Sequence, residues 1–258
     1  MKYGFIGCGN MGNAIAKALA AGNVDFAVSD RSGKAKAFGF PYCSPREVAE
    51  KADRIFLAVK PQMMAEVLSE LSPILARRRP VLISMAAGLT MNRIASMAGG
   101  NFPVIRIMPN TPVSVGCGMT LYCANDLVKQ DILEDFLKDM APSGRMDALE
   151  ERLFDAAGTV SGCGPAYVYM FIEAMADGAV ACGVPRAKAM EYAAATIAGA
   201  GMFALKSGQH PGALKDAVCS PKGSTLQGLR ILEQRGFRSA ATDCVIATYE
   251  KNKEIAKN

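Results

Sequence analysis

Five short apolar runs alternate with segments of helical periodicity through residues 1–155 of the chain. The apolar runs lie at 3–6, 25–29, 54–59, 81–85 and 104–108. The helical patterns cover 11–21, 61–75 and 90–98. Strands that are apolar throughout and alternate with helices are typical of a parallel sheet with helices on both faces. The pattern therefore predicts an α/β domain of the Rossmann type, a doubly wound sheet, over residues 1–155.

Only helical patterns follow from residue 156 onward. They cover 166–182, 186–206, 211–218, 225–235 and 238–255. The segment EYAAATIAGAGMFAL at 191–205 is apolar nearly all round, and a helix of this kind is buried on more than one side. A domain of about 100 residues can hardly cover it alone. We therefore expect residues 156–258 to form an all-helical domain that packs against a second copy of the chain.

Composition and charge limit the classes of function. Half of the 258 residues are apolar and 21% are charged, as in soluble globular proteins. The net charge of +5 comes without a basic face, so we expect no nucleic-acid partner and favour a small anionic ligand. No run approaches the ~18 apolar residues that cross a membrane, and the first residues do not resemble a signal peptide. We expect a cytoplasmic protein with no membrane partner.

Few residues are available for metal or hydrolase chemistry. The eight cysteines are dispersed, none lies in a C-x-x-C pair, and His210 is the single histidine. A zinc site needs several nitrogen or sulfur ligands at short spacings, so we predict no metal. No G-x-S-x-G motif presents a serine nucleophile. Dispersed cysteines are typical of a reducing compartment.

The string GCGNMG at 7–12 matches G-x-G-x-x-G between a predicted strand and a predicted helix. In that context the pattern indicates a dinucleotide site rather than a tight turn without a ligand. Gly7 permits the turn, Gly9 lets the pyrophosphate approach, and Gly12 lets helix and strand pack closely. The helix N-terminus offers unpaired N–H groups to the phosphates. The same turn adds three candidate contacts, Cys8, Asn10 and Met11.

The end of the second predicted strand carries two conflicting signals for the cofactor. Asp30 stands where an acidic residue usually holds the ribose hydroxyls of NAD. Arg31 and Ser32 follow at once, and a guanidinium beside a hydroxyl suits the 2′-phosphate of NADP. A polar loop without cofactor contact is the alternative. We favour NADP(H), with NAD(H) accepted.

Several further strings carry a resemblance to a known family. They are AVKP at 58–61, SMAAGLT at 84–90, RIMPNTP at 106–112, SGCGPAY at 161–167 and SPKGST at 220–225. In this order and spacing they resemble the Δ1-pyrroline-5-carboxylate reductases, over nearly the whole chain. The resemblance implies hydride transfer from NAD(P)H to the cyclic imine 1-pyrroline-5-carboxylate, which gives L-proline in the last step of proline biosynthesis. It also implies a homodimer, or a ring of dimers, with the nicotinamide meeting the helical domain.

Two more segments at strand ends become candidate cofactor contacts through this resemblance. Open α/β sheets bind ligands at the carboxyl ends of their strands. The first segment ends in a lysine that would reach ribose or phosphate, unless it faces solvent; it consists of Ala58, Val59 and Lys60. The second is small enough for the nicotinamide to approach; it consists of Ala86, Ala87 and Gly88. Asn110 either hydrogen-bonds the carboxamide or shapes the loop between two prolines.

The string SPKGST is the candidate holder of the substrate carboxylate. Its N–H groups open the next predicted helix without internal partners, which suits an anion. The candidate substrate contacts are Ser220, Gly223, Ser224 and Thr225. By resemblance, the Thr225 hydroxyl points at the imine nitrogen and acts in catalysis; a plain helix cap is the alternative. Lys222 departs from the family, which commonly has glycine there, and lysine is strained if the turn needs a positive φ.

Two other functions compete with imine reduction. Dehydrogenases of the β-hydroxyacid type share the layout but use a lysine in a G-x-x-x-K helix motif, and GCGPAYVYM at 162–170 has no lysine. A non-enzymatic NADP(H)-binding redox scaffold would keep GCGNMG but would not need SPKGST. Oxidation of the cofactor by the cyclic imine separates these alternatives.

Overall fold

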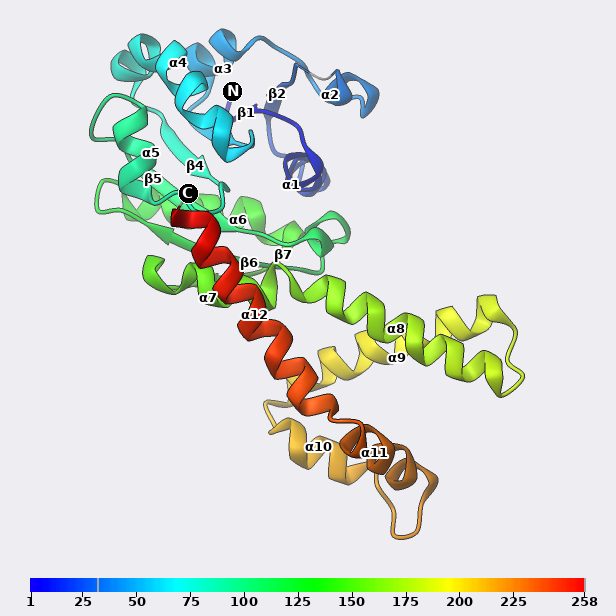
Figure 1. The fold of residues 1–258 in the computed structure, drawn as a ribbon. Helices are drawn as coiled ribbons and strands as arrows, with labels where there is room; N and C mark the ends of the chain where they lie inside the picture. The colour runs from blue at the N-terminus through cyan, green and yellow to red at the C-terminus, as the bar shows by residue number, and fades with distance from the viewer. Residues whose placement is uncertain (32, 258) are drawn as a thin grey trace. The chain divides into compact units, whose positions relative to one another are not determined.

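The structure, a computed structural model, describes residues 1–31 and 33–257, so the predicted contact Ser32 lies outside the described residues. The chain forms two compact units (Figure 1). The first contains residues 1–165 together with the last helix from Tyr249 onward, and the second is Ala166–Thr248.

A seven-stranded sheet forms the centre of the first unit. Its strands are β1 (Tyr3–Ile6), β2 (Phe26–Ser29), β3 (Arg54–Leu57), β4 (Val81–Ser84), β5 (Val104–Met108), β6 (Gly118–Ala124) and β7 (Gly144–Ala148). The spatial order is β2-β1-β3-β4-β5-β6-β7. Strands β1 to β5 are parallel, β6 runs antiparallel to β5, and β7 is parallel to β6. The predicted doubly wound sheet is confirmed, and β6 and β7 extend it beyond the prediction.

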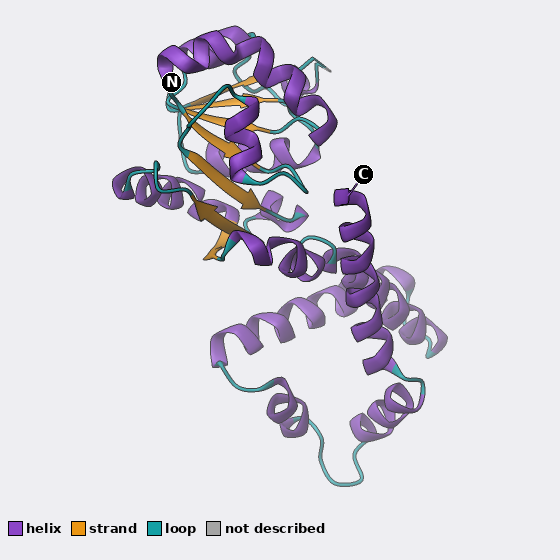
Figure 2. Cartoon of the chain, turned by 60° about the vertical axis from the view of Figure 1, so that its left-hand side comes forward, coloured by secondary structure: helices purple, strands orange, loops and turns teal. Residues whose placement is uncertain are grey.

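Helices cover both faces of this sheet (Figure 2). On one face lie α1 (Asn10–Ala21) and α6 (Gln130–Met140); on the other lie α3 (Pro45–Lys51), α4 (Met64–Arg78) and α5 (Met91–Met97). Successive side chains of a strand point to opposite faces, so Phe5 joins the first core and Ile6 the second. In the first core Phe5 stacks on Phe56, with ring centroids 4.5 Å apart. Burial on both faces explains why these strands are apolar throughout.

Short elements connect the main ones in the first unit. They are the helices α2 (Lys34–Ala37) and α7 (Phe154–Ser161) and the 3₁₀ turns η1 (Pro61–Met63), η2 (Thr111–Val115), η3 (Ala141–Ser143) and η4 (Glu151–Leu153). Helix α3 begins with a capping box, in which the Ser44 hydroxyl accepts from the Glu47 N–H and the Glu47 carboxylate accepts from the Ser44 N–H. These reciprocal bonds fix the entry of the helix beside β1.

Helices alone make up the second unit, as predicted. They are α8 (Gly164–Ala181), α9 (Arg186–Ser207), α10 (Pro211–Ala217), α11 (Ser224–Gln234) and α12 (Phe237–Lys257), of which α8 and α12 run into the first unit. The small core of this unit contains Ala176, Ala189 and Ala193, whereas Met170 and Leu205 are 75% and 65% exposed. Among the described residues, no helix combines the length and apolar character needed to cross a membrane.

An ionic cluster joins α6 to the amino-terminal edge of the sheet. The Arg54 guanidinium lies 2.7 Å from the Asp135 carboxylate, and the Lys2 ammonium lies 2.7 Å from that of Asp139. Tyr3 donates its hydroxyl hydrogen to Asp139 at 2.7 Å. Burial alone would raise the pKa of Asp135, but hydrogen bonds from Arg54 and Lys2 hold it below its ordinary value. Two acidic residues one helical turn apart thus attach α6 to the starts of β1 and β3.

We predict that Arg54→Met lowers the free energy of unfolding by about 2–4 kcal/mol, because it leaves the Asp139 carboxylate buried with fewer partners. Urea unfolding of the full chain measures the loss. Arg46→Met is the matched control, since Arg46 forms an exposed pair with Glu50 on α3 and its removal should cost less than about 0.5 kcal/mol. Equal losses in the two variants would contradict the role of the cluster.

Candidate cofactor and substrate sites

The three glycines of the GCGNMG turn differ in what a side chain at each position would meet. Gly7 has a φ of +98°, and a Cβ there would lie 2.6 Å from the carbonyl oxygen of Ala58. A Cβ on Gly12 would lie 3.0 Å from the Cβ of Ala58. Gly9 has an ordinary φ of −69° at the N-cap of α1, and a Cβ there would meet nothing within 4 Å. Gly7 and Gly12 are thus required by packing, whereas the space beside Gly9 is open to a ligand.

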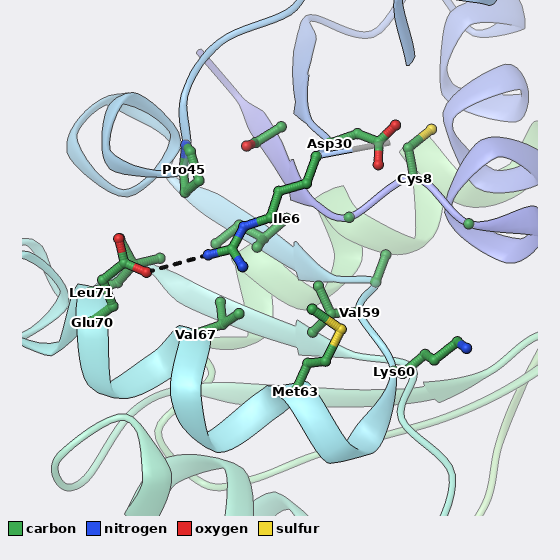
Figure 3. Close-up of a pocket in the computed structure, with 15 residues that line it drawn as sticks. Ile6, Cys8, Asp30, Pro45, Val59, Lys60, Met63, Val67, Glu70 and Leu71 are labelled. Atoms are coloured by element: carbon green, nitrogen blue, oxygen red, sulfur yellow. Dashed lines mark ion pairs between the residues drawn. The ribbon is translucent and has the colours of Figure 1, made fainter. Parts of the chain in front are cut away.

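A pocket of about 360 Å³ opens beside this turn (Figure 3). Eight of the predicted cofactor contacts line it: Gly7, Cys8, Gly9, Asp30, Arg31, Ala58, Val59 and Lys60. They come from the carboxyl ends of β1, β2 and β3, which lie next to one another in the sheet. The predicted contacts Asn10, Met11 and Gly12 follow in the first turn of α1 and do not line the pocket.

Helix α4 and the turn before it line one side of the pocket, which the sequence did not predict. The additional lining residues are Ile6, Ser29, Pro45, Met63, Val67, Glu70 and Leu71. Met63, Val67 and Leu71 are spaced by four, so they share one face of the helix and point toward the pocket (Figure 3). That spacing was visible in the sequence, but the sequence does not say which face of α4 turns to the sheet edge.

The charged side chains of the pocket lie on the loop after β2, on α4 and in the AVKP segment. Arg31 pairs with two carboxylates of α4, at 3.9 Å from Glu66 and 3.7 Å from Glu70. The Asp30 carboxylate accepts a hydrogen bond from the N–H of Ala35 at 3.3 Å. Lys60 lies away from Glu70 in Figure 3. The polar loop after β2 therefore belongs to the pocket wall and carries both of the conflicting cofactor signals.

The small residues Ala86, Ala87 and Gly88 follow β4 and do not line the pocket. Gly88 has a φ of +73°, which favours glycine. The segment that follows is anchored by Glu151, whose carboxylate accepts the N–H of Met91 at 2.7 Å and lies 3.2 Å from the buried guanidinium of Arg106. This anchor fixes the start of α5, and so one end of the segment expected to face the nicotinamide.

Asn110 links three parts of the first unit. Its side-chain NH₂ donates to the carbonyl of Ser161 at 2.9 Å, and its Oδ1 accepts the N–H of Met119 at 2.9 Å. The residue is buried and forms the N-cap of η2. This geometry favours the loop-shaping alternative for Asn110, because both ends of its amide already have partners within the protein.

The turn SPKGST joins α10 to α11 in the second unit. The N–H of Gly223 donates to the carbonyl of Ser220 at 2.9 Å, so it is used by the turn and is not open to a ligand. A Cβ on Gly223 would lie 2.9 Å from the backbone carbonyl oxygen of Ser220, which favours glycine at this position. The N–H groups of Ser224 and Thr225 open α11 without a backbone partner among the described residues.

No side-chain hydroxyl of this turn caps α11. The N-cap is Gly223, which has no side chain, so the alternative of a helix cap is not favoured for Ser224 or Thr225. Lys222 has a φ of +63°, the conformation in which lysine is strained. His210 is a cap, since its Nδ1 accepts the N–H of Gly212 at 3.0 Å at the start of α10.

Comparisons with known families agree with this arrangement. Residues 2–88 match the family described as NADP oxidoreductase, coenzyme F420-dependent. Residues 151–255 match the family described as pyrroline-5-carboxylate reductase dimerisation. Fold, pocket and family matches together define the class as an oxidoreductase with an NADP-type Rossmann domain.

Full-length relatives narrow the class to one family. Pyrroline-5-carboxylate reductase of Escherichia coli (strain K12) is 42% identical over 267 residues, covering 100% of this chain and 99% of that protein. The Glycine max protein of the same name is 36% identical, with 98% and 95% covered. The crystal structure of Plasmodium falciparum pyrroline carboxylate reductase with NADP bound matches with a TM-score of 0.89 and 34% identity, covering 99% and 98%. The chain belongs to the pyrroline-5-carboxylate reductase family.

The different roles of Gly7 and Gly9 give a paired prediction. Gly7→Ala should lower the free energy of unfolding by about 2–5 kcal/mol, because the new methyl group meets Ala58 and the backbone is strained. Gly9→Ala should keep stability within about 1 kcal/mol but weaken binding of NADP⁺ about 10-fold or more, because it fills ligand space. Urea unfolding and calorimetric titration measure the two effects. A Gly9→Ala protein that binds NADP⁺ normally would contradict the assignment.

We predict that Lys222→Gly raises the free energy of unfolding by about 0.5–1 kcal/mol, because glycine adopts the positive φ at little cost. Thermal unfolding of the full chain measures the change. Asn23→Gly is the control: Asn23 also has a positive φ, of 54°, but asparagine tolerates it well, so the gain should be smaller. A less stable Lys222→Gly protein would show that the lysine side chain contributes more than its backbone costs.

Proposed function

We propose that this chain reduces 1-pyrroline-5-carboxylate to L-proline with a hydride from NADP(H), the last step of proline biosynthesis. The observation that carries the proposal is the 42% identity, over the whole chain, to the Escherichia coli protein named for this activity. The dinucleotide turn and SPKGST supply the two parts that an imine reductase needs: a place for the nucleotide and a place for a small acid.

The cofactor is proposed to bind along the carboxyl edge of β1, β2 and β3, in the pocket beside Gly9. Residues 1–155 would form this dinucleotide-binding domain. NADP(H) is favoured, because the first family match is an NADP oxidoreductase and the Plasmodium falciparum structure has NADP bound. NAD(H) is expected to be accepted as well, since Asp30 remains suited to a ribose hydroxyl. When bound, the cofactor supplies the hydride.

The substrate carboxylate is proposed to bind the start of α11, at the N–H groups of Ser224 and Thr225. The positive end of the helix dipole favours an anion there. Ser220 and Gly223 shape the turn that leaves these groups exposed. The imine carbon gains the hydride and the imine nitrogen keeps or gains a proton, so the C=N bond becomes a C–N single bond. The Thr225 hydroxyl is proposed to hydrogen-bond that nitrogen.

The helical domain, residues 156–258, is proposed to form a homodimer or a ring of dimers. Large apolar side chains such as Met170, Phe203 and Leu205 are exposed in the single chain, and residues 151–255 match a dimerisation family. Large apolar side chains exposed together on one domain are typical of an interface between chains. A cytoplasmic location is proposed from the dispersed cysteines.

A spectrophotometric assay tests the proposed reaction. The full chain is mixed with pyrroline-5-carboxylate and either NADPH or NADH, and the loss of absorbance of the reduced cofactor is followed. Cofactor oxidation that depends on the imine supports the proposal. Oxidation by a β-keto acid instead would favour a dehydrogenase of the β-hydroxyacid type, and binding of NADPH without turnover of any imine would favour the redox scaffold.

We predict that Thr225→Ala lowers kcat by about 10- to 1,000-fold, the range typical of one positioned donor, and leaves the Kd for NADPH unchanged. Stopped-flow turnover and equilibrium titration measure the two quantities. Thr225→Ser is the matched variant, because it keeps the hydroxyl and should recover most of kcat. Unchanged turnover in Thr225→Ala would remove this hydroxyl from the mechanism.

A further inference from the structure

Two acidic residues of α4 hold the arginine at the rim of the nucleotide pocket. Glu66 and Glu70 are one helical turn apart, so their side chains leave the same face of α4. Arg31 lies 3.9 Å from the Glu66 carboxylate and 3.7 Å from that of Glu70, and the dashed line to Glu70 in Figure 3 marks the second pair. Both Arg31 and Glu70 line the pocket. The guanidinium is therefore engaged by carboxylates across the pocket wall.

Arg31 is the group that suits a 2′-phosphate, since a guanidinium binds phosphate through two parallel hydrogen bonds. In this chain the same guanidinium is shared with two carboxylates of α4, and Asp30 joins Glu70 as a second carboxylate that lines the pocket. A bound 2′-phosphate brings up to two further negative charges. The phosphate must displace the carboxylates from Arg31, and it is then repelled by their negative charges nearby. Lys60 lies away from Glu70 and does not relieve this competition (Figure 3).

We infer that Glu66 and Glu70 are specificity-determining residues, which compete with the 2′-phosphate of NADP(H) for Arg31 and so narrow the preference for NADP(H) over NAD(H). The inference rests on the proposed nucleotide pocket. NAD(H) carries no 2′-phosphate, so it does not need Arg31 and is insensitive to the competition. The pair thus tunes the ratio of the two affinities rather than binding of the dinucleotide as a whole.

The size of the effect follows from exposure. Arg31, Glu66 and Glu70 are 64%, 69% and 61% exposed, so each pair is an exposed ion pair. Such pairs change an equilibrium by about two- to five-fold. Salt screens exposed charges, so the effect should shrink at an ionic strength of about 0.5 M.

Calorimetric titration of the full chain with NADP⁺ and with NAD⁺ tests the inference. In Glu70→Gln the Kd for NADP⁺ should fall about two- to five-fold, and that for NAD⁺ should change less than about 1.5-fold. Glu66→Gln should act in the same direction. Glu134→Gln is the matched control, since it removes the same charge from the exposed face of α6, away from the pocket, and should change neither Kd.

A double variant tests whether Glu70 acts through Arg31. In Arg31→Ala, the further change Glu70→Gln should alter the NADP⁺ to NAD⁺ ratio less than it does in the wild-type chain, because the shared guanidinium is gone. An unchanged ratio in Glu70→Gln, or an equal gain for both nucleotides, overturns the inference while leaving the reductase proposal intact. A wild-type chain that binds neither nucleotide overturns both, and the imine assay is not needed to decide between these outcomes.

Discussion

The pocket proposed for the nucleotide depends on the close approach of two backbone segments at Gly7 and Ala58. At this point β1 turns into α1 while β3 ends beside it, and no side chain fits between them. The left-handed conformation of Gly7 turns the chain, and the small Gly12 lets α1 pack on the same residue. Since α1 begins there, its N-terminus is placed next to the ends of β2 and β3. One steric constraint thus brings the GCGNMG turn, the loop after β2 and the AVKP segment to a common edge of the sheet.

The two edges of the sheet are built in opposite ways. The carboxyl edge ends in glycines and small residues and leaves N–H groups and space, which is what a ligand needs. The amino edge carries Lys2, Arg54 and the two aspartates of α6, which form ion pairs with one another. A buried ionic cluster adds little net stability compared with an apolar one, but each of its members is costly to remove. It therefore fixes where α6 sits on the sheet.

Much of the fold could be predicted from the sequence because its strands are buried on both faces. All five predicted strands and all eight predicted helical segments are present. The strands β6 and β7 were missed: β7 reads GRMDA, with polar residues at alternate positions, and such a strand carries no continuous apolar signal. The helices α2, α3, α6 and α7 were missed as well. In α6 the buried residues are only Phe136 and Met140, a sparse pattern in a segment that is otherwise charged.

Site residues at strand ends could be predicted from the sequence, whereas site residues placed by helix packing could not. Contacts at strand ends follow from the strands themselves, so Gly7, Asp30 and Lys60 were found together in one pocket. Glu70 was not, because its place depends on how α4 is rotated on the sheet, which tertiary packing decides. For Lys222, the sequence indicates only that a positive φ would be strained, and the structure shows that its φ is positive. A lysine kept in a conformation that favours glycine stores local strain, and such strain persists where the surrounding turn over-determines the backbone. Here the N–H of Gly223 donates to the carbonyl of Ser220 across the turn, and the N–H groups of Ser224 and Thr225 have no backbone partner among the described residues.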